Sequence, residues 1–241
     1  TPHPTVRATR RRRPPVPDTL AAAWTIAAKD LLLEFRSRTA FLSALVFTAI
    51  VLAIFNFARD PTAVSTVDMA PGILWITFSF AGLLGLNRAF ALERENRALD
   101  GLLLSPASRT ALYLGKVLAN LVFVGTVEAI ALPLFAVFFN LPLLPVLAPL
   151  SAVIALATIG FVTVGTLMSA IAVNTRFADL MLPVLMLPFL MPPITSAVQV
   201  TSRLFGGRPF SEVAAWLKLL VGYDIVFIVV CILIFEHILD E

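Results

Sequence analysis

Six apolar runs constrain this chain more than any other feature of its sequence. Several of them reach the roughly 20 residues that a helix needs to cross a bilayer. Hydrophobic residues make up 59% of the chain and charged residues 14%, whereas soluble domains have about 25% charged residues. We therefore predict an all-α integral membrane protein with six transmembrane helices and no soluble catalytic domain. The predicted spans are residues 39–57, 70–87, 111–139, 150–173, 180–191 and 216–235.

The fifth run differs from the others because prolines interrupt it. Pro183 and Pro188 lie within the run, and the adjacent Pro192 and Pro193 follow it. Proline lacks the N–H that continues a helix, so the pair is predicted to end this span. The more polar segment that follows, residues 194–215, is expected on the extracytoplasmic side.

Two local signals refine the other spans. Asp68 is the predicted N-cap of the second span, since a carboxylate can accept bonds from the free N–H groups of the first turn. Small residues four positions apart are expected to let the spans approach one another closely. These pairs are Ala81 with Gly85, Gly115 with Ala119, and Gly165 with Ser169.

The first 38 residues are predicted to lie outside the bilayer core. Residues 1–17 are rich in arginine and proline and are expected to form a disordered cytoplasmic tail, which touches anionic headgroups or is simply solvated. An arginine run also occurs in export signals and nucleic-acid-binding segments, but no apolar core follows directly, and no nucleic-acid partner is predicted. Residues 18–38 are predicted to form an amphipathic helix in the headgroup plane, with a soluble packing helix as the alternative. Its apolar face consists of Leu20, Trp24, Ala27, Leu31 and Phe35.

Basic residues set the predicted orientation. If the N-terminus is cytoplasmic, the same side of the membrane receives 14 of the 18 lysine and arginine residues. Lysine and arginine concentrate on the cytoplasmic side of membrane proteins. Both termini are therefore predicted to be cytoplasmic, and so is the connection between the second and third spans.

That connection contains a charged stretch, residues 90–106, with the sequence FALERENRALDGLLLSP. Its charges cannot remain in hydrocarbon, where each costs about 2.5 to 3.5 kcal/mol at the centre of a span. Leucines three or four positions apart predict a short amphipathic helix, and an ordinary solvated loop is the alternative. The charged members are Glu93, Arg94, Glu95, Arg97 and Asp100, and the leucines are Leu92, Leu99, Leu102 and Leu103.

Glu128 and Asp224 are acids within the predicted third and sixth spans. An intramembrane carboxyl is a candidate functional group, although a neutral carboxyl satisfied by a neighbouring backbone group is a common structural use. Pro133 leaves the carbonyl of Ala129 without its helical donor, which favours a neutral, hydrogen-bond-donating Glu128. The two acids could face one polar cleft.

Metal and haem ligands are not indicated by any spacing in the chain. His3 and His237 lie near opposite termini, and the single cysteine, Cys231, excludes an internal disulfide. Haem iron is usually held by His, Cys, Met or Tyr. We expect no cofactor bound by this chain, and we expect His237 to be an ordinary interfacial residue.

Several sequence runs resemble the heme exporter protein B family, the permease of cytochrome c maturation among the ABC-2 type exporter permeases. These runs are APGILW at residues 70–75, LNRAF at 86–90, the charged stretch, and LYLGKVLAN at 112–120. The similarity covers nearly all of residues 20–238. Within the charged stretch the family pattern is matched without a gap by Phe90, Glu93, Leu99, Asp100, Leu102, Leu104, Ser105 and Pro106. Asn96 and Arg97 replace the second acid and the glycine of that pattern.

The resemblance implies that the chain is the permease subunit of an ABC transporter in the bacterial inner membrane, with residues 39–241 as the permease domain. Expected partners are a CcmA-like ATPase, a second permease copy, and haem-handling CcmC-, CcmD- and CcmE-like membrane proteins. Haem is a candidate substrate, and ATP is expected on the ATPase, since the chain has no GxxxxGK[ST] phosphate loop.

The resemblance also implies which residues meet the ATPase. A coupling helix at about residues 93–104 would seat in a groove of the ATPase, as an amphipathic helix does in helix-in-groove recognition. Its contact residues would be Glu93, Arg94, Glu95, Arg97, Leu99, Asp100, Leu102 and Leu103. Arg176 and Asp179, in the next cytoplasmic connection, form the candidate second contact.

Two other functions remain open from the residues alone. One is an exporter permease of the same fold that carries a lipid, a drug or a glycan. The other is a non-ABC protein, either a secondary transporter or a membrane assembly factor. A secondary transporter is expected to have repeated halves with matching broken segments, whereas here the prolines that interrupt helices cluster in the second half.

Overall fold

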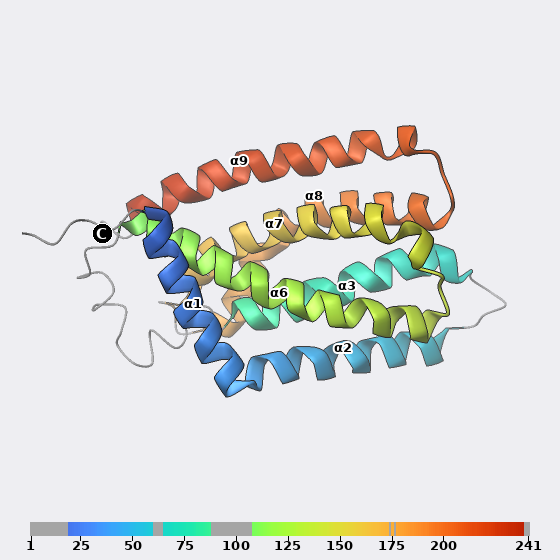
Figure 1. Cartoon of the computed structure of the whole chain (residues 1–241), viewed down its shortest axis with the longest axis horizontal. Coiled ribbons are helices and arrows are strands. Elements are labelled where there is room, and N and C mark those ends of the chain that lie inside the picture. Colours follow the sequence, from blue (N-terminus) through green and yellow to red (C-terminus); the bar gives the residue numbers. More distant parts are fainter. Residues whose placement is uncertain (1–18, 60–64, 88–107, 174, 176, 239–241) are drawn as a thin grey trace, which may run out of the picture.

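The computed structural model describes residues 19–59, 65–87, 108–173, 175 and 177–238. Within these residues the fold is entirely helical, with two short 3-10 turns at Leu144–Val146 and Phe210–Glu212. The six long apolar helices lie roughly along the long axis of the molecule, and α1 runs obliquely to them near one end (Figure 1). The helices are α1 (Thr19–Ser37), α2 (Thr39–Ala58), α3 (Thr66–Leu86), α6 (Arg109–Phe139), α7 (Leu147–Ala172), α8 (Ala178–Phe205) and α9 (Ala214–Ile238).

Helices α2, α3, α6, α7, α8 and α9 are each long and apolar enough to cross a membrane. The predicted all-α membrane fold with six spans is therefore confirmed, and the chain is a multi-pass membrane protein. The spans are not equally enclosed by the rest of the protein. In α3, 61% of the most apolar 18-residue stretch is buried, whereas in α2 and α9 the share is only 22%. Figure 1 shows the reason, because α2 and α9 form opposite edges of the bundle and α3 lies inside it.

The predicted end of the fifth span is wrong. Helix α8 continues through all four of its prolines to Phe205, so the first part of the polar segment 194–215 is helical. Pro193 cannot donate to the carbonyl of Phe189, four residues earlier. The hydroxyl of Tyr223 in α9 donates to that carbonyl instead, at 2.8 Å. Transmembrane helices tolerate proline where a neighbouring helix satisfies the freed group in this way.

The predicted N-cap of the second span is also wrong. Helix α3 begins earlier than expected, and Ser65 is its cap. The Ser65 hydroxyl accepts from the backbone N–H of Asp68 at 3.3 Å and donates to the Asp68 carboxylate at 2.8 Å. Asp68 therefore occupies the position of the acid in a capping box rather than the cap itself.

Helix α1 is held against α6 by close packing and by an ion pair whose lysine is buried. A Cβ on Gly115 of α6 would lie 2.8 Å from the backbone oxygen of Ala23, so only glycine allows this approach. The Lys116 ammonium, which is 2% exposed, lies 2.9 Å from the Asp30 carboxylate of α1. Trp24 of α1 is 65% exposed. The position of this helix in the headgroup plane stays a prediction.

The connection between α3 and α6 begins and ends at the same end of the bundle as the C-terminal part of α9 (Figure 1). The Ser169 hydroxyl near the end of α7 donates to the carbonyl of Leu86 at the end of α3, at 2.8 Å. The Arg109 guanidinium at the start of α6 donates to the carbonyl of Glu236 in α9, at 3.1 Å. We call this end the α1 end, and the opposite end the α2–α3 turn end.

The bond from Tyr223 to the carbonyl freed by Pro193 predicts a specific coupling. Tyr223→Phe should destabilise the protein by about 1 kcal/mol, because it leaves a partly buried carbonyl without a donor. Pro193→Ala restores a backbone donor to the same carbonyl. The cost of Tyr223→Phe should therefore shrink in the Pro193→Ala background, as measured by unfolding midpoints of the purified protein. Strictly additive costs in the double variant would contradict this account.

Candidate functional site

Polar side chains form a layer across the middle of the bundle. The buried apolar residues fall into two clusters, one toward the α1 end and one toward the α2–α3 turn end. At the level where the clusters meet, α6 contributes Glu128, α7 contributes Thr158 and α9 contributes Asp224, all less than 7% exposed. The predicted intramembrane acids therefore lie at the junction of the two apolar clusters.

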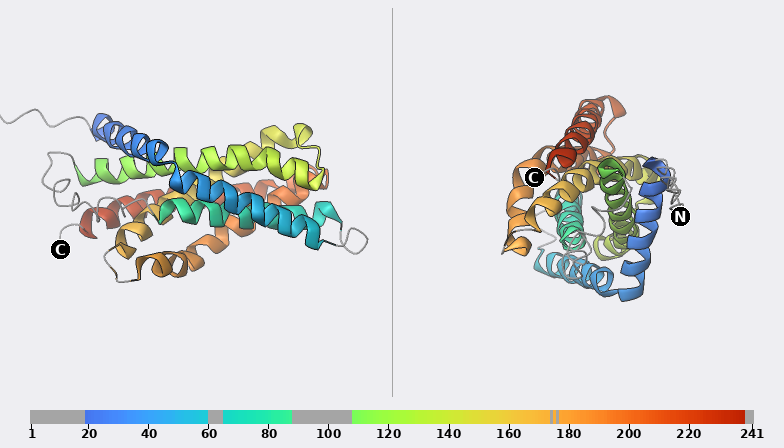
Figure 2. Two further views of the ribbon diagram at one scale, coloured as in Figure 1. Left: turned by 90° about the horizontal axis from the view of Figure 1, so that it is seen from below. Right: turned by 90° about the vertical axis from the view of Figure 1, so that its left-hand side faces the viewer.

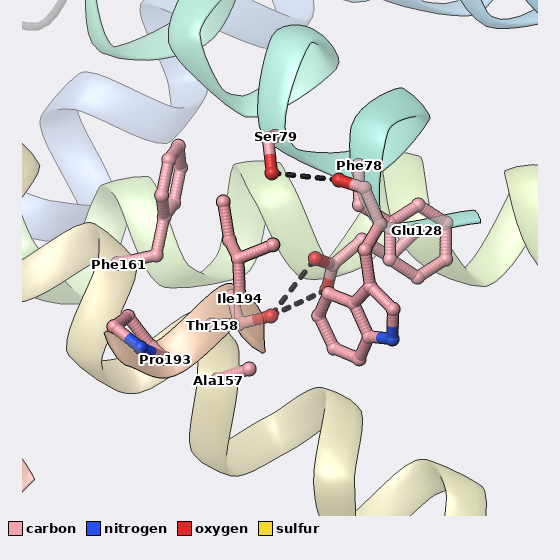
Figure 3. Close-up of a pocket in the computed structure, with 9 residues that line it drawn as sticks. Phe78, Ser79, Glu128, Ala157, Thr158, Phe161, Pro193 and Ile194 are labelled. Carbon is pink, nitrogen blue, oxygen red and sulfur yellow. Dashed lines mark hydrogen bonds between the residues drawn. The ribbon is translucent and has the colours of Figure 1, made fainter. Parts of the chain in front are cut away.

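The carboxyl group of Glu128 forms its hydrogen bonds with one residue of α7. The Thr158 hydroxyl lies 2.8 Å from one oxygen of the Glu128 carboxyl group and 2.9 Å from the other. Figure 3 shows the carboxyl group pointing at this hydroxyl, with Phe161 and Ile194 nearby. Since a hydroxyl has one proton to donate, the pair leaves hydrogen-bonding capacity of the carboxyl group unused.

Two hollows meet at the Glu128–Thr158 pair. The larger, which we call the α6–α7 groove, has a volume of about 510 Å³ and is lined by residues of these two helices alone. The smaller, which we call the inner cavity, has a volume of about 20 Å³ and is closed by α3 and α8 (Figure 3). A cavity of that size holds about one water molecule. The carboxyl group thus stands between the inside of the bundle and a groove in its side.

Asp224 has a different environment. Neither of its carboxyl oxygens has a hydrogen-bond partner among the described residues. A Cβ on Gly160 of α7 would lie 2.5 Å from the nearer oxygen, so this acid packs directly against the α7 backbone. Residues two apart on a helix face nearly opposite ways. Thr158 and Gly160 therefore face opposite sides of α7. Glu128, which contacts Thr158, and Asp224, which contacts Gly160, lie on these opposite sides and do not share one cleft.

The residues predicted to meet an ATPase stay predictions. Glu93, Arg94, Glu95, Arg97, Leu99, Asp100, Leu102 and Leu103 lie outside the described residues, and so does Arg176. Asp179 is in the first turn of α8, but its side chain is also outside the described part. The helices that flank these segments begin or end at the α1 end of the bundle (Figure 2).

Comparison with known proteins decides the family. A model of the CcmB protein family matches residues 21–240. The chain belongs to this family. A relative named heme exporter protein B from Rhodobacter capsulatus is 33% identical over 178 residues, which are 74% of this chain and 81% of the relative. A relative of the same name from Pseudomonas aeruginosa is 30% identical over 194 residues, 80% of this chain and 86% of the relative. Another from Paracoccus denitrificans is 31% identical over 175 residues, 73% and 80% of the two chains.

Sequence reasoning about this CcmB-family chain missed the partners of its polar groups. Glu128 stands out as a charge in an apolar run, but Thr158 is one of many hydroxyl residues in the spans and lies 30 residues away. The ion pair of Lys116 with Asp30 of α1 is not among the sequence predictions either. The sequence does hint at the contact between α6 and α1, because Gly115, next to Lys116, lies where the two helices approach closely.

The packing of Asp224 against Gly160 predicts a steric cost. Gly160→Ala should lower stability by about 1 to 3 kcal/mol, as overpacking does, because the new methyl group meets both the carboxyl group and the ring of Tyr223. Gly222→Ala is the matched control, since nothing lies within 4 Å of its added Cβ. The unfolding midpoints of the two variants measure the difference. Equal unfolding midpoints for the two variants would mean that α9 is not closely packed against α7 at Gly160.

Proposed function

We propose that this chain is the membrane permease subunit of an ABC transporter for cytochrome c biogenesis. It couples ATP hydrolysis by a separate CcmA-like ATPase to haem export or to release of a haem-loaded chaperone. The observation that carries this proposal is family membership over nearly the whole chain, together with relatives named heme exporter protein B. The sequence contains no GxxxxGK[ST] phosphate loop, and in this proposal ATP is bound and hydrolysed on the partner.

The proposed contact with the ATPase is the charged stretch between α3 and α6. Its acids would meet basic residues of the partner, and its leucines would fill an apolar groove. Arg176 and Asp179, between α7 and α8, would form the second contact. Both segments join helices at the α1 end of the bundle (Figure 1), so one partner surface can reach both.

The packing at the α1 end would transmit a displacement of the charged stretch to the neighbouring helices. A Cβ on Gly85 near the end of α3 would lie 2.3 Å from the ring of Phe123 in α6, so α3 and α6 interlock. Lys116 joins α6 to α1. The Thr110 hydroxyl donates to the Glu236 carboxylate and joins the start of α6 to α9. Displacement of this one connection would therefore move α1, α3, α6 and the end of α9 together.

The remaining partners and the location follow from the same proposal. The permease would pair with a second copy so that two ATPases face each other, and it would work beside CcmC-, CcmD- and CcmE-like proteins that handle haem. The complex would lie in the bacterial inner membrane with both termini in the cytoplasm. The concentration of lysine and arginine on that side supports this orientation.

The proposal predicts that the acids of the charged stretch hold the ATPase. The triple variant Glu93→Gln, Glu95→Gln, Asp100→Asn should weaken association with the co-expressed ATPase about 10- to 100-fold, because three charge-assisted contacts are lost. Co-purification from detergent extracts measures it. The matched control removes the ion pair Arg208–Glu212 at the opposite end of the bundle. An ATPase complex that stays intact in the triple variant would make this stretch an ordinary solvated loop.

The orientation has its own test. A cysteine at Asn96 or at the exposed Ser211 is introduced after Cys231→Ala, and intact cells with a permeable outer membrane are treated with a membrane-impermeant maleimide. The cysteine at 211 should be labelled from outside, and the cysteine at 96 only after the inner membrane is opened. Labelling of position 96 in intact cells would place the charged stretch outside and overturn the coupling proposal.

A further inference from the structure

The α6–α7 groove is a built feature of the bundle rather than a gap between loosely packed helices. Both walls follow helical spacing, so one stripe of each helix faces the hollow. Its volume of about 510 Å³ is within the roughly 300 to 1,000 Å³ of small-molecule sites. The lining residues are Leu121, Gly125, Glu128, Ala129 and Leu132 of α6, and Leu147, Ser151, Ile154, Ala155, Thr158 and Ile159 of α7.

Small residues keep the groove open. Gly125 faces it from α6, and a Cβ added there would have no atom within 4 Å. This differs from Gly115 and Gly160, whose missing side chains make room for a neighbouring helix. Ala129 and Ala155 also line the groove. Space at Gly125 is therefore left for something other than the described part of this chain.

The position of the groove determines what can enter it. Thr158 lies 11 residues from the beginning of α7 and Glu128 lies 11 residues from the end of α6, which is about 16 Å at 1.5 Å per residue. That depth is about half of a 30 Å hydrocarbon layer. The groove therefore runs from the α2–α3 turn end, where Leu147 begins α7, to the depth of Glu128. An occupant that pairs with Glu128 lies within the hydrocarbon layer.

In the part of the chain that the structure describes, the groove lining contains an acidic side chain and no basic one. Glu128 is the only ionisable group in its lining among the described residues, and no lysine, arginine or histidine lines it. The nearest polar groups are the hydroxyls of Thr158 and Ser151, and the Ser151 hydroxyl donates to the carbonyl of Ala148 at 2.9 Å. An intramembrane acid without a cation of its own is suited to act as the counter-ion of a ligand.

We propose that the α6–α7 groove binds a lipophilic cation, an amphiphile with a protonated amine on a single apolar chain. Glu128, predicted to be neutral in the empty groove, gives up its proton as the ammonium binds, and the two form an ion pair. The chain lies along the leucine and isoleucine side chains of the groove. A neutral chain alone would leave the carboxyl group without a further partner, and an anionic amphiphile could not form this ion pair. This site is separate from the proposed haem function, since haem carries carboxylates, and it requires no ATPase.

The test uses the full chain in phosphatidylcholine nanodiscs and three photoreactive alkyl diazirines of equal chain length. They end in an ammonium, a hydroxyl or a carboxylate. After irradiation, peptide mass spectrometry compares labelling of α6 and α7 with labelling of the lipid-facing helix α2, which corrects for partitioning into the bilayer. The ammonium probe should label the groove peptides about tenfold more than either of the others.

Variants separate the groove from other acidic or lipid-facing positions. Glu128→Gln keeps an acceptor for Thr158 but removes the charge, and it should reduce ammonium labelling to the level of the hydroxyl probe. Gly125→Leu should reduce labelling by all three probes because it fills the hollow. Gly222→Leu, with equally free space, and Asp224→Asn, on the other side of α7, should leave labelling unchanged. Equal labelling by the three probes, or full ammonium labelling in Glu128→Gln, would overturn the proposal.

Discussion

A polar group inside a bilayer must find its partner within the protein, and this constraint joins the helices of the CcmB-family bundle. Carbonyls of one helix accept from hydroxyls of another: Phe189 from Tyr223, Leu86 from Ser169 and Thr163 from Tyr113. Lipid is as apolar as leucine, so burying apolar surface does not favour association as it does in water. Such bonds, with close packing at glycines, therefore fix which helices are neighbours.

The same contacts make the α1 end of the bundle stiff. Gly115 brings the α1 backbone onto α6, and Gly85 receives the ring of Phe123. A Cβ on Gly165 of α7 would lie 2.4 Å from Leu86, so α7 fits closely to α3 as well. Close-packed interiors transmit displacement rather than absorb it. A force applied between α3 and α6 therefore reaches α7 through side chains that have no space to yield.

The sequence predicts what is local and misses what depends on a distant partner. Hydropathy locates all six spans because length and apolarity belong to each run alone. The continuation of α8 past Pro193 could not be predicted, since it depends on the hydroxyl of Tyr223, 34 residues from the accepting carbonyl of Phe189. Glu128 and Asp224 were found as charges in apolar runs, but their placement on opposite sides of α7 depends on helix rotation. The hydrogen bond between Glu128 and Thr158 could not be predicted for the same reason.

The layer at Glu128 also connects the two proposed properties of the protein. The charged stretch joins α3 to α6 at one end, and the α6–α7 groove runs from the opposite end to the Glu128–Thr158 pair. Any motion that separates α6 from α7 lengthens the Glu128–Thr158 bond and changes the width of the groove. Linkage is reciprocal, so an occupant that favours one separation must bias the position of α6 at the α1 end by the same free energy. A groove ligand would then alter the affinity for the ATPase without touching it.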